Sequence, residues 1–238
     1  MADKTVKFGD TWLEDIAPDI RIDDISVSAI VLNPIANDRP IQFGRQFVRN
    51  VGSSRTVTIT FAIQLDDRDA REEELQAIRD WAKTDKEYTL VLPHFTGRYL
   101  EAVCTEQPDS SYRKWWQNNL RLTFTCFNNP FWTSDSITEI PCGTEFSVGG
   151  SAPPLMTIEN RYIAPGTNKA YSKGSQVMRF SRIPAGNMVI DLNNQTAAVG
   201  GVSIMQYFNP LDSFIEPATG ARQVINGTGT VKVRERWI

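Results

Sequence analysis

The stretch from Asn119 to Thr133 constrains the fold more than any other part of the sequence, because it predicts both a strand and the point at which that strand must end. Its apolar positions alternate with polar ones, the period-two pattern of a strand with one face against a core. These positions are Leu120, Leu122, Phe124 and Cys126. Proline has no amide donor and moves the residue before it away from helical geometry, so strand pairing must stop at Asn129-Pro130.

The residues that follow this strand predict a domain junction, formed by Pro130, Phe131 and Trp132. Two large rings directly after a chain stop are typical of residues packed into a seam, and burying one ring is worth roughly 1.5–3 kcal/mol. An ordinary strand end with aromatic neighbours fits the pattern equally well. A chain of 238 residues suits two modest domains, which we expect at residues 1–133 and 134–238.

Composition and charge exclude several classes of protein. The formal net charge is −3 and neither half is basic, so we expect no nucleic-acid recognition. The sequence has no run of about 18 apolar residues and no secretion signal. We therefore expect that the protein is made in the cytoplasm and does not associate with a membrane. Cys104, Cys126 and Cys142 are odd in number and widely spaced, which favours buried thiols over disulfides or a zinc site.

A cluster of acidic residues near the start raises the question of a metal site. Its members are Asp10, Glu14, Asp15, Asp19, Asp23 and Asp24. Their spacing is not that of a calcium-binding EF-hand loop, and no glycine stands at the turn. A solvated acidic face is the favoured interpretation, and no metal or cofactor is expected.

In the first half, alternation predicts a strand over 55–65 that pairs with 120–126, and shorter strands over 20–27, 88–93 and 98–104. Residues 66–83 predict a helix that packs on the sheet through Leu75 and Ile78, with Asp69 and Glu72 at the spacing of a capping box.

The segment 33–54 is too apolar for an ordinary loop and too charged for a core. One interpretation is an exposed hairpin or arm that a partner covers, because arginine and aromatic residues are enriched in interface cores. The other is a long irregular connection over its own domain. Both interpretations stay open on sequence alone.

After the junction, charge becomes sparser and glycine, proline, asparagine and threonine increase, which favours an all-β sandwich of short strands. The candidate strands are 155–163, 176–183, 187–192, 202–207 and 229–237. Asn226-Gly227 predicts a tight hairpin, since both residues tolerate positive φ.

No motif of nucleophilic, metal-dependent or nucleotide-dependent catalysis is present, so we expect no enzyme activity. Glycoside hydrolysis needs only two suitably spaced carboxylates, and nothing selects a pair among the candidates Glu101, Glu106, Asp109, Glu159 and Asp191. The single histidine, His94, is expected at a surface turn. Trp115-Trp116 could stack on a sugar or nucleobase, although core or subunit contacts are commoner.

The order of the predicted elements and the residues of several stretches resemble those of the distal tail proteins of long-tailed (siphovirus-type) bacteriophages. The resemblance covers nearly the whole chain, and it rests on Phe8-Gly9, 52–61, 75–81, 122–132, 187–194 and 214–238. Where that family usually has a proline-glycine turn before its last hairpin, this chain has Pro217-Ala-Thr-Gly220, which puts the length of that loop in doubt.

The resemblance implies a mainly β fold with one main helix. The first domain would be a split β-barrel with a projecting arm around 33–54, and the second a galectin-like β-sandwich at the periphery. It implies a structural baseplate hub of the virion tail tip: a homo-hexameric ring between the tail tube protein and the adhesion or receptor-binding proteins.

The same resemblance makes the arm a contact with the neighbouring subunit, with Phe43, Arg45, Phe47 and Arg49 as the candidate residues. A carbohydrate-binding module is the alternative function, and a cell-wall glycoside hydrolase is a more distant one. The second half has no histidine, so it lacks the cluster of one tryptophan with nearby histidine, asparagine, arginine and glutamate that galectins use on sugars.

Overall fold

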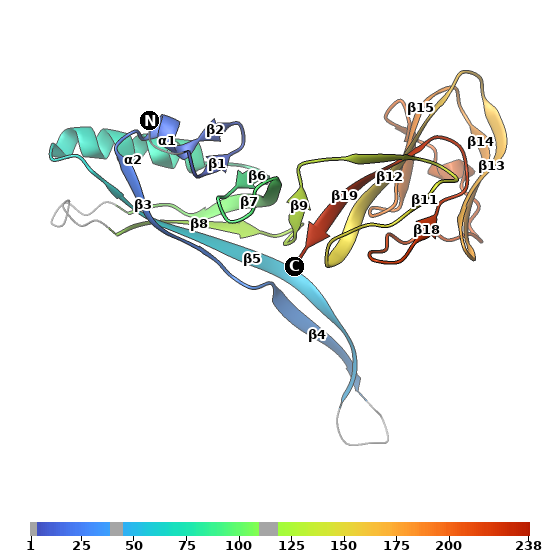
Figure 1. Ribbon diagram of the computed structural model, residues 1–238, viewed down its shortest axis with the longest axis horizontal. Coiled ribbons are helices and arrows are strands. Elements are labelled where there is room, and N and C mark those ends of the chain that lie inside the picture. Colours follow the sequence, from blue (N-terminus) through green and yellow to red (C-terminus); the bar gives the residue numbers. More distant parts are fainter. Residues whose placement is uncertain (1–3, 39–44, 110–118) are drawn as a thin grey trace. The chain divides into compact units, whose positions relative to one another are not determined.

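The computed structural model describes residues 4–38, 45–109 and 119–238. The chain divides into two compact units, Met1–Trp132 together with Ile238, and Thr133–Trp237. Both are built mainly from strands, and α2 is the one long helix among the described residues (Figure 1). The predicted fold class, mainly β with one main helix, is therefore confirmed. Each unit is described by itself below.

The first unit is an antiparallel sheet with a helix packed on it. The strand order is β3-β5-β8-β7-β6-β1-β2, and the sheet does not close on itself. The elements are β1 (Lys7–Phe8), β2 (Thr11–Trp12), α1 (Leu13–Ile16), β3 (Ile20–Val27), β4 (Val31–Asp38), β5 (Arg45–Ile63), α2 (Arg68–Ala82), β6 (Tyr88–Val91), β7 (Arg98–Glu106) and β8 (Leu120–Cys126).

The predicted pairing of the two alternating strands is confirmed. β5 and β8 are antiparallel, with Val57 opposite Phe124 and Ile59 opposite Leu122. All four side chains are fully buried, because the alternation places them together on the face that the helix covers. β5 ends at Ile63, two residues before the predicted end of the strand.

Helix α2 packs on this face through the predicted stripe, in which Leu75 and Ile78 are buried. Its N-cap is Asp67, whose side chain accepts a hydrogen bond of 2.8 Å from the amide of Ala70. The predicted capping box at Asp69 and Glu72 is therefore wrong. Asp67 follows a turn and has extended backbone geometry, as an N-cap requires, whereas Asp69 is already inside the helix.

The segment expected around 33–54 contains a long β-hairpin, which decides between the two interpretations of its sequence. β4 pairs antiparallel with the first part of β5, from Val31 opposite Ser54 to Asp38 opposite Arg45 (Figure 1). The register shifts between Val31 and Leu32 and again between Ile35 and Ala36. The irregular-connection interpretation is wrong. β5 is a single strand that runs from the hairpin into the sheet.

The second unit is a two-layer sandwich. One layer has the strand order β17-β16-β15-β12-β19-β10, and the pairs β13–β14 and β11–β18 are separate small sheets. The elements are β10 (Thr138–Pro141), β11 (Glu145–Phe146), β12 (Ala152–Tyr162), β13 (Gly166–Lys173), β14 (Gln176–Ile183), β15 (Gly186–Asp191), β16 (Thr196–Val199), β17 (Val202–Ser203), η2 (Met205–Tyr207), β18 (Gln223–Val224) and β19 (Thr230–Trp237), while β9 (Trp132–Ser134) spans the boundary between the units.

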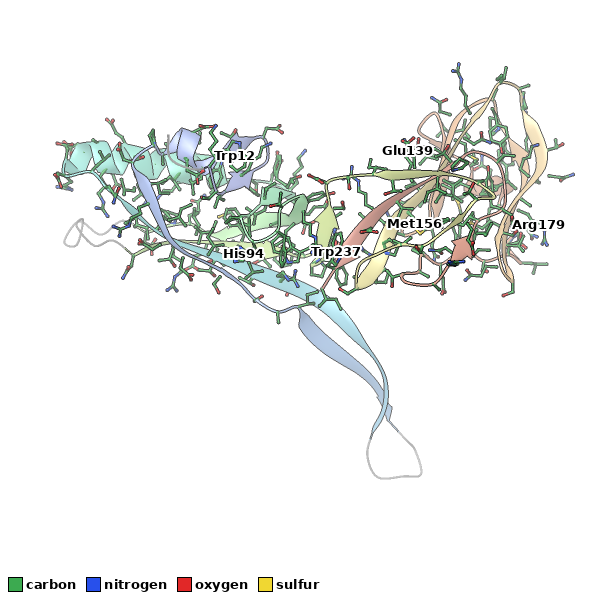
Figure 2. All side chains as sticks on the ribbon, in the orientation of Figure 1. Trp12, His94, Glu139, Met156, Arg179 and Trp237 are labelled. Carbon is green, nitrogen blue, oxygen red and sulfur yellow. The ribbon has the colours of Figure 1, made fainter. Side chains whose placement is uncertain are left out.

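The core of the sandwich lies between its layers. Met156 (Figure 2) and Ile158 from β12 belong to the same cluster of buried residues as Met178 and Phe180 from β14. In β19, Val231 and Val233 are buried and Lys232 between them is partly exposed.

Two predictions in this unit are wrong. Residues 202–207 form a two-residue strand and a 3₁₀ turn instead of one strand. Asn226-Gly227 does not form a tight hairpin, because Asn226 makes a bridge to Ser172 on β13. Two-residue hairpins lie instead at Gly174-Ser175 and at Gly200-Gly201, where Gly174 and Gly200 have the positive φ values of 57° and 56° that such turns need.

None of the described helices is long and apolar enough to cross a membrane.

Candidate assembly surfaces

Three of the four residues predicted for subunit contact lie on one strand of the hairpin. Arg45, Phe47 and Arg49 belong to β5, and Phe43 lies outside the described residues. Their backbone partners on β4 are Asp38, Ala36 and Ile35. Among the described residues, the part of β5 before Arg55 pairs only with β4, because β8 pairs with β5 from Arg55 onward and β3 from Val57 onward.

The sequence of this part of the chain is strongly one-sided in charge. Between Asp38 and Asp66 there is no acidic residue, and the basic residues are Arg39, Arg45, Arg49 and Arg55. Arginine pairs well with carboxylates and stacks on aromatic rings, so an acidic surface with exposed rings is a suitable partner for this segment.

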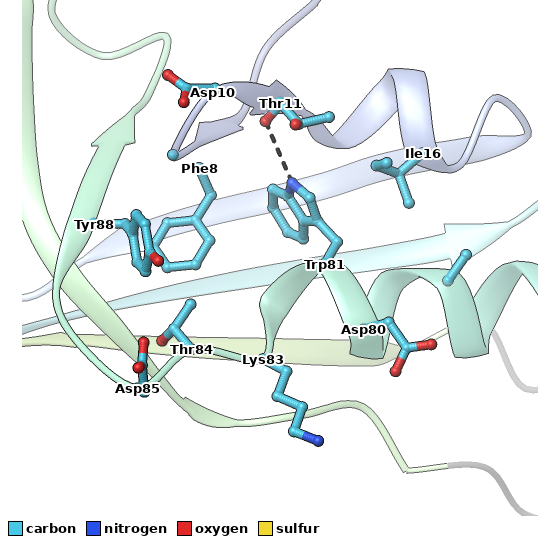
Figure 3. A pocket seen from close by; sticks show the side chains of 12 residues that line it. Phe8, Asp10, Thr11, Ile16, Asp80, Trp81, Lys83, Thr84, Asp85 and Tyr88 are labelled. Atoms are coloured by element: carbon cyan, nitrogen blue, oxygen red, sulfur yellow. Dashed lines mark hydrogen bonds between the residues drawn. The ribbon is translucent and has the colours of Figure 1, made fainter.

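The first unit carries such a surface as an open groove of about 870 Å³ (Figure 3). Three separate segments form it: the β1–β2 turn, the last turn of α2 and the loop that leads into β6. The lining residues are Phe8, Gly9, Asp10, Thr11, Ile16, Ala77, Asp80, Trp81, Lys83, Thr84, Asp85 and Tyr88. The two-residue turn Gly9-Asp10, in which Gly9 has a φ of 60°, places Asp10 at its edge.

The floor of the groove is aromatic. The ring of Phe8 lies edge-on to Trp81 and to Tyr88, with centroid distances of 5.7 and 5.8 Å. Phe8 also packs at 4.9 Å on Phe124 in the sheet below, and Trp81 donates a hydrogen bond of 3.3 Å to the carbonyl of Thr11 (Figure 3). These contacts hold the rings in place, while Trp81 and Tyr88 keep part of their surface in the groove.

The rim of the groove is acidic. Asp10, Asp80 and Asp85 are exposed, and Lys83 is the single basic residue of the lining. Just outside the lining, the ammonium of Lys86 lies 5.2 Å from the centre of the Tyr88 ring. A floor of rings below a rim of carboxylates can bind a basic segment that carries apolar side chains, because it offers both area to bury and opposite charge.

The residues predicted as a domain junction lie at the boundary between the two units. Pro130 and Trp132 are buried and Phe131 is half-buried. Within the first unit, Trp132 packs edge-on against Phe95 at 5.0 Å, and the guanidinium of Arg55 lies 6.0 Å from the centre of the Trp132 ring. The junction role itself stays a prediction.

The carboxylates considered for glycoside hydrolysis are divided between the units. Glu101, Glu106 and Asp109 belong to the first, and Glu159 and Asp191 to the second. Glu106 accepts a hydrogen bond of 2.8 Å from the Thr123 hydroxyl, and Glu159 forms an ion pair of 2.8 Å with Lys232.

Lys232 donates hydrogen bonds to Glu159 and Glu139, and these raise the pKa of its ammonium group. Asp191 accepts hydrogen bonds from the amides of Asn193 and Asn194, which shape the turn after β15. Each of these contacts gives its carboxylate a role in the local structure.

The other candidate residues also have structural surroundings. His94 is exposed in the turn after β6 (Figure 2). Five of the six clustered acids near the start are exposed, all except the half-buried Glu14.

Burial raises the pKa of the Cys126 thiol to about 12. Among the described residues no group of three possible ligands gathers around a metal position, and Trp115-Trp116 lies outside them.

A smaller groove of about 460 Å³ lies on the second unit beside β14 and η2. Tyr207 and Phe208 line it together with the polar side chains of Asn168, Arg179 and Gln206. Arg179 forms an ion pair of 2.8 Å with Asp212, and Asn168 has an unusual φ of 51°. Sequence reasoning missed both grooves because each is formed by segments distant in sequence.

No protein-family model and no curated protein matches the sequence. The structure is similar to the crystal structure of the SPP1 Dit protein, a paradigm of the hub adsorption apparatus in phages that infect Gram-positive bacteria. The TM-score is 0.76 at 11% sequence identity, over 98% of this chain and 99% of that one. The chain therefore has the fold of that Dit protein, as the resemblance predicted.

Two structures of the phage p2 baseplate, in its activated conformation with Ca and with Sr, also match. Their TM-scores are 0.49 and 0.47 at 9% and 10% identity, with 91% of this chain and 90% of each of those chains covered. Similarity at this level carries no further argument.

Proposed function

We propose that this chain is a distal tail protein of a long-tailed bacteriophage. It is a structural hub protein of the virion, made in the host cytoplasm, and not an enzyme. Six copies form a ring that joins the tail tube to the proteins that adhere to the host receptor. The observation that carries this proposal is the likeness to the SPP1 Dit protein over nearly the full length of both chains.

The long hairpin supports the ring. A rotational ring needs heterologous contacts, in which one patch of a subunit meets a different patch of the next. β4 pairs with the first part of β5, and no other described strand pairs with this part of the hairpin; an edge of this kind is normally covered by a partner. Phe43, Arg45, Phe47 and Arg49 are the proposed contact residues of the hairpin.

Fold alone does not establish function, so the assembly state is the decisive measurement. We expect light scattering on a sizing column to give a mass near six times 26.8 kDa, and negative-stain images of that peak to show rings. A monomer at every concentration tested would contradict a ring that assembles by itself.

The hairpin residues can be tested in the same assay. Replacing Phe43 and Phe47 together with serine should give folded monomers, because the change removes apolar area from the contact. The matched control replaces Phe127 and Ile163, which are 55% and 94% exposed, with serine. Unchanged rings in the hairpin variant, or monomers in both variants, would contradict the assignment.

The second unit has a peripheral role in this proposal. We place the attachment of adhesion or receptor-binding proteins on the galectin-like sandwich, and the contact with the tail tube protein on the ring formed by the first unit. Co-expression with neighbouring tail proteins, followed by purification through a tag on this chain, should recover the tube protein and the adhesion protein in one complex.

Binding of a glycan by the second unit is a second candidate, and the groove beside Tyr207 favours it. An aromatic ring with amide and guanidinium groups around it suits a sugar, which presents an apolar face and a hydroxyl rim. Glycan-array binding by the full chain that is lost on replacing Tyr207 with alanine would support this function. Absence of binding would leave the groove without that role.

A further inference from the structure

We propose that the acidic aromatic groove of the first unit receives the hairpin of a second copy of this chain. The segment Arg45–Arg49 of one copy would lie in the groove formed by Phe8, Trp81 and Tyr88 of the next. This inference rests on the proposed ring and names the contact that holds it together.

Charge complementarity points to this occupant. The rim carries three exposed carboxylates against one lysine, and the hairpin strand lies in a stretch of 27 residues, 39–65, with four arginines and no acid. Opposite potentials steer two surfaces together and fix their register, and guanidinium groups stack on aromatic faces such as the floor of this groove. Both partners of the contact are thus present in one sequence.

The hairpin of a given copy cannot reach its own groove. Phe8 in the groove floor packs on Phe124, and Phe124 pairs with Val57 of β5. From Val57 the same continuous strand leads to Arg49 after about 26 Å and to Arg45 after about 40 Å, at the usual rise per residue. Because a paired strand does not fold back on itself, the contact has to be made between copies.

The length of the hairpin suits a neighbour in a ring. Residues 45–54 span about 33 Å as a strand, and a compact unit the size of Met1–Trp132 is roughly 35 Å across. The hairpin therefore extends over about one subunit width. Each copy offers one hairpin and one groove, which is the arrangement that lets a heterologous contact repeat until the ring closes.

The test is a charge swap in the full chain. The groove variant carries Asp10→Lys, Asp80→Lys and Asp85→Lys, and all three positions are exposed, so the fold should be kept. The hairpin variant carries Arg45→Glu and Arg49→Glu. Each variant alone puts like charges together in every contact, so we expect each to lose the hexamer peak and elute as a 26.8 kDa monomer.

An equimolar mixture of the two variants should recover the ring. The wild-type hairpin of the groove variant meets the wild-type groove of its neighbour, and the reversed hairpin meets the reversed groove, so alternating copies restore opposite charge at every contact. The recovered peak should contain both chains in a 1:1 ratio by mass spectrometry. Recovery should weaken in high salt, which screens exposed charges.

The matched control carries the same change of net charge outside the groove, as Asp135→Lys, Glu145→Lys and Glu216→Lys on exposed positions of the second unit. It should form rings like the wild type. Rings in the groove variant, or no recovery in the mixture, would overturn the groove contact while leaving the ring proposal intact. A wild-type chain that never forms rings would instead overturn the proposed self-assembling ring, and this contact with it.

Discussion

The indole of Trp132 packs edge-on against the ring of Phe95, with their centroids 5.0 Å apart. Phe95 stands in the β6–β7 turn and Trp132 ends the continuous segment of the first unit, so this contact fixes the end of that segment to its sheet. Trp132 is 3% exposed and Phe95 is 43% exposed, so Phe95 forms the outer cover of the indole.

Replacing Trp132 with alanine should lower the free energy of unfolding by about 3–5 kcal/mol, because the change removes a buried ring and leaves a cavity. Trp132→Phe should cost less, since much of the contact area remains. Urea unfolding measures both. The control is Phe127→Ala on an exposed side chain, for which we expect a change within about 0.5 kcal/mol. Equal effects at the two positions would refute the packing role.

Arg55 lies beneath Trp132 and is 4% exposed, yet its Nε and Nη1 atoms have no hydrogen-bond partner among the described residues. Burial lowers the pKa of its guanidinium. Arg55→Met keeps most of the apolar stem and removes a buried charge that has incomplete hydrogen bonding among the described residues, so stability should be unchanged or higher by up to about 2 kcal/mol. Arg121→Met on the exposed face is the control. A loss of stability above 2 kcal/mol would show that Arg55 has a stabilising partner.

Gly227 should not tolerate a side chain. Its φ is 149°, and a Cβ atom there would approach the buried ring of Tyr171 to 2.4 Å. Gly227→Ala should destabilise the second unit by about 2–4 kcal/mol through overpacking and backbone strain. At Gly200, with a φ of 56° and nothing within 4 Å of the added atom, alanine should cost about 1 kcal/mol. Thermal unfolding of both variants gives the comparison, and equal costs would contradict the clash.

Glu74 should make stability depend on pH. Its Oε1 atom accepts a hydrogen bond of 3.0 Å from the Asp19 amide, and its Oε2 atom is buried without a partner among the described residues. Burial raises the pKa of this carboxyl in the folded chain. The folded state thus binds the proton more tightly than the unfolded one, so lowering the pH from 7 through the folded-state pKa relieves the cost of the buried charge.

Glu74→Gln keeps an oxygen for the Asp19 amide but has no charge to titrate. The difference in unfolding temperature, variant minus wild type, should therefore be more positive at pH 7 than at pH 4.5. A change of roughly 1 kcal/mol in the free energy of unfolding corresponds to a shift of a few degrees at most. Thermal unfolding at both values measures it. Glu73→Gln, on an exposed neighbour, should show no such trend. A constant difference for Glu74→Gln would contradict the shifted pKa.

Local patterns in the sequence determined much of the fold. Val57, Ile59 and Phe61 alternate along one strand, and Leu75 and Ile78 recur along one helix, so each segment shows which of its faces is buried. Such periodicity can be recognised in the sequence because burial of one face is a property of a single element. The resemblance to distal tail proteins rested partly on the order of those elements, and the fold that it predicted agrees with the similarity to the SPP1 Dit protein.

The hairpin and the turn at Asn226 were beyond that kind of reasoning. Within the described part of the chain, residues 45–54 pair only with β4, and they have no clear alternation, so hydrophobic periodicity does not mark them as a strand. Asn226-Gly227 has the composition of a tight turn, but a bridge to Ser172 and the ring of Tyr171 decide its geometry. Long-range pairing overrode the local preference there.

The sequence by itself determined which segments are strands and helices with one face to bury. It also showed that four arginines lie in a stretch without acidic residues. Only the tertiary structure decided what those faces meet. Phe8 is far in the chain from Trp81 and Tyr88, and the packing of three different elements brings its ring within 6 Å of each of theirs to make a groove. The physical reason is that periodicity records burial along one element, whereas a surface for assembly depends on the packing of several.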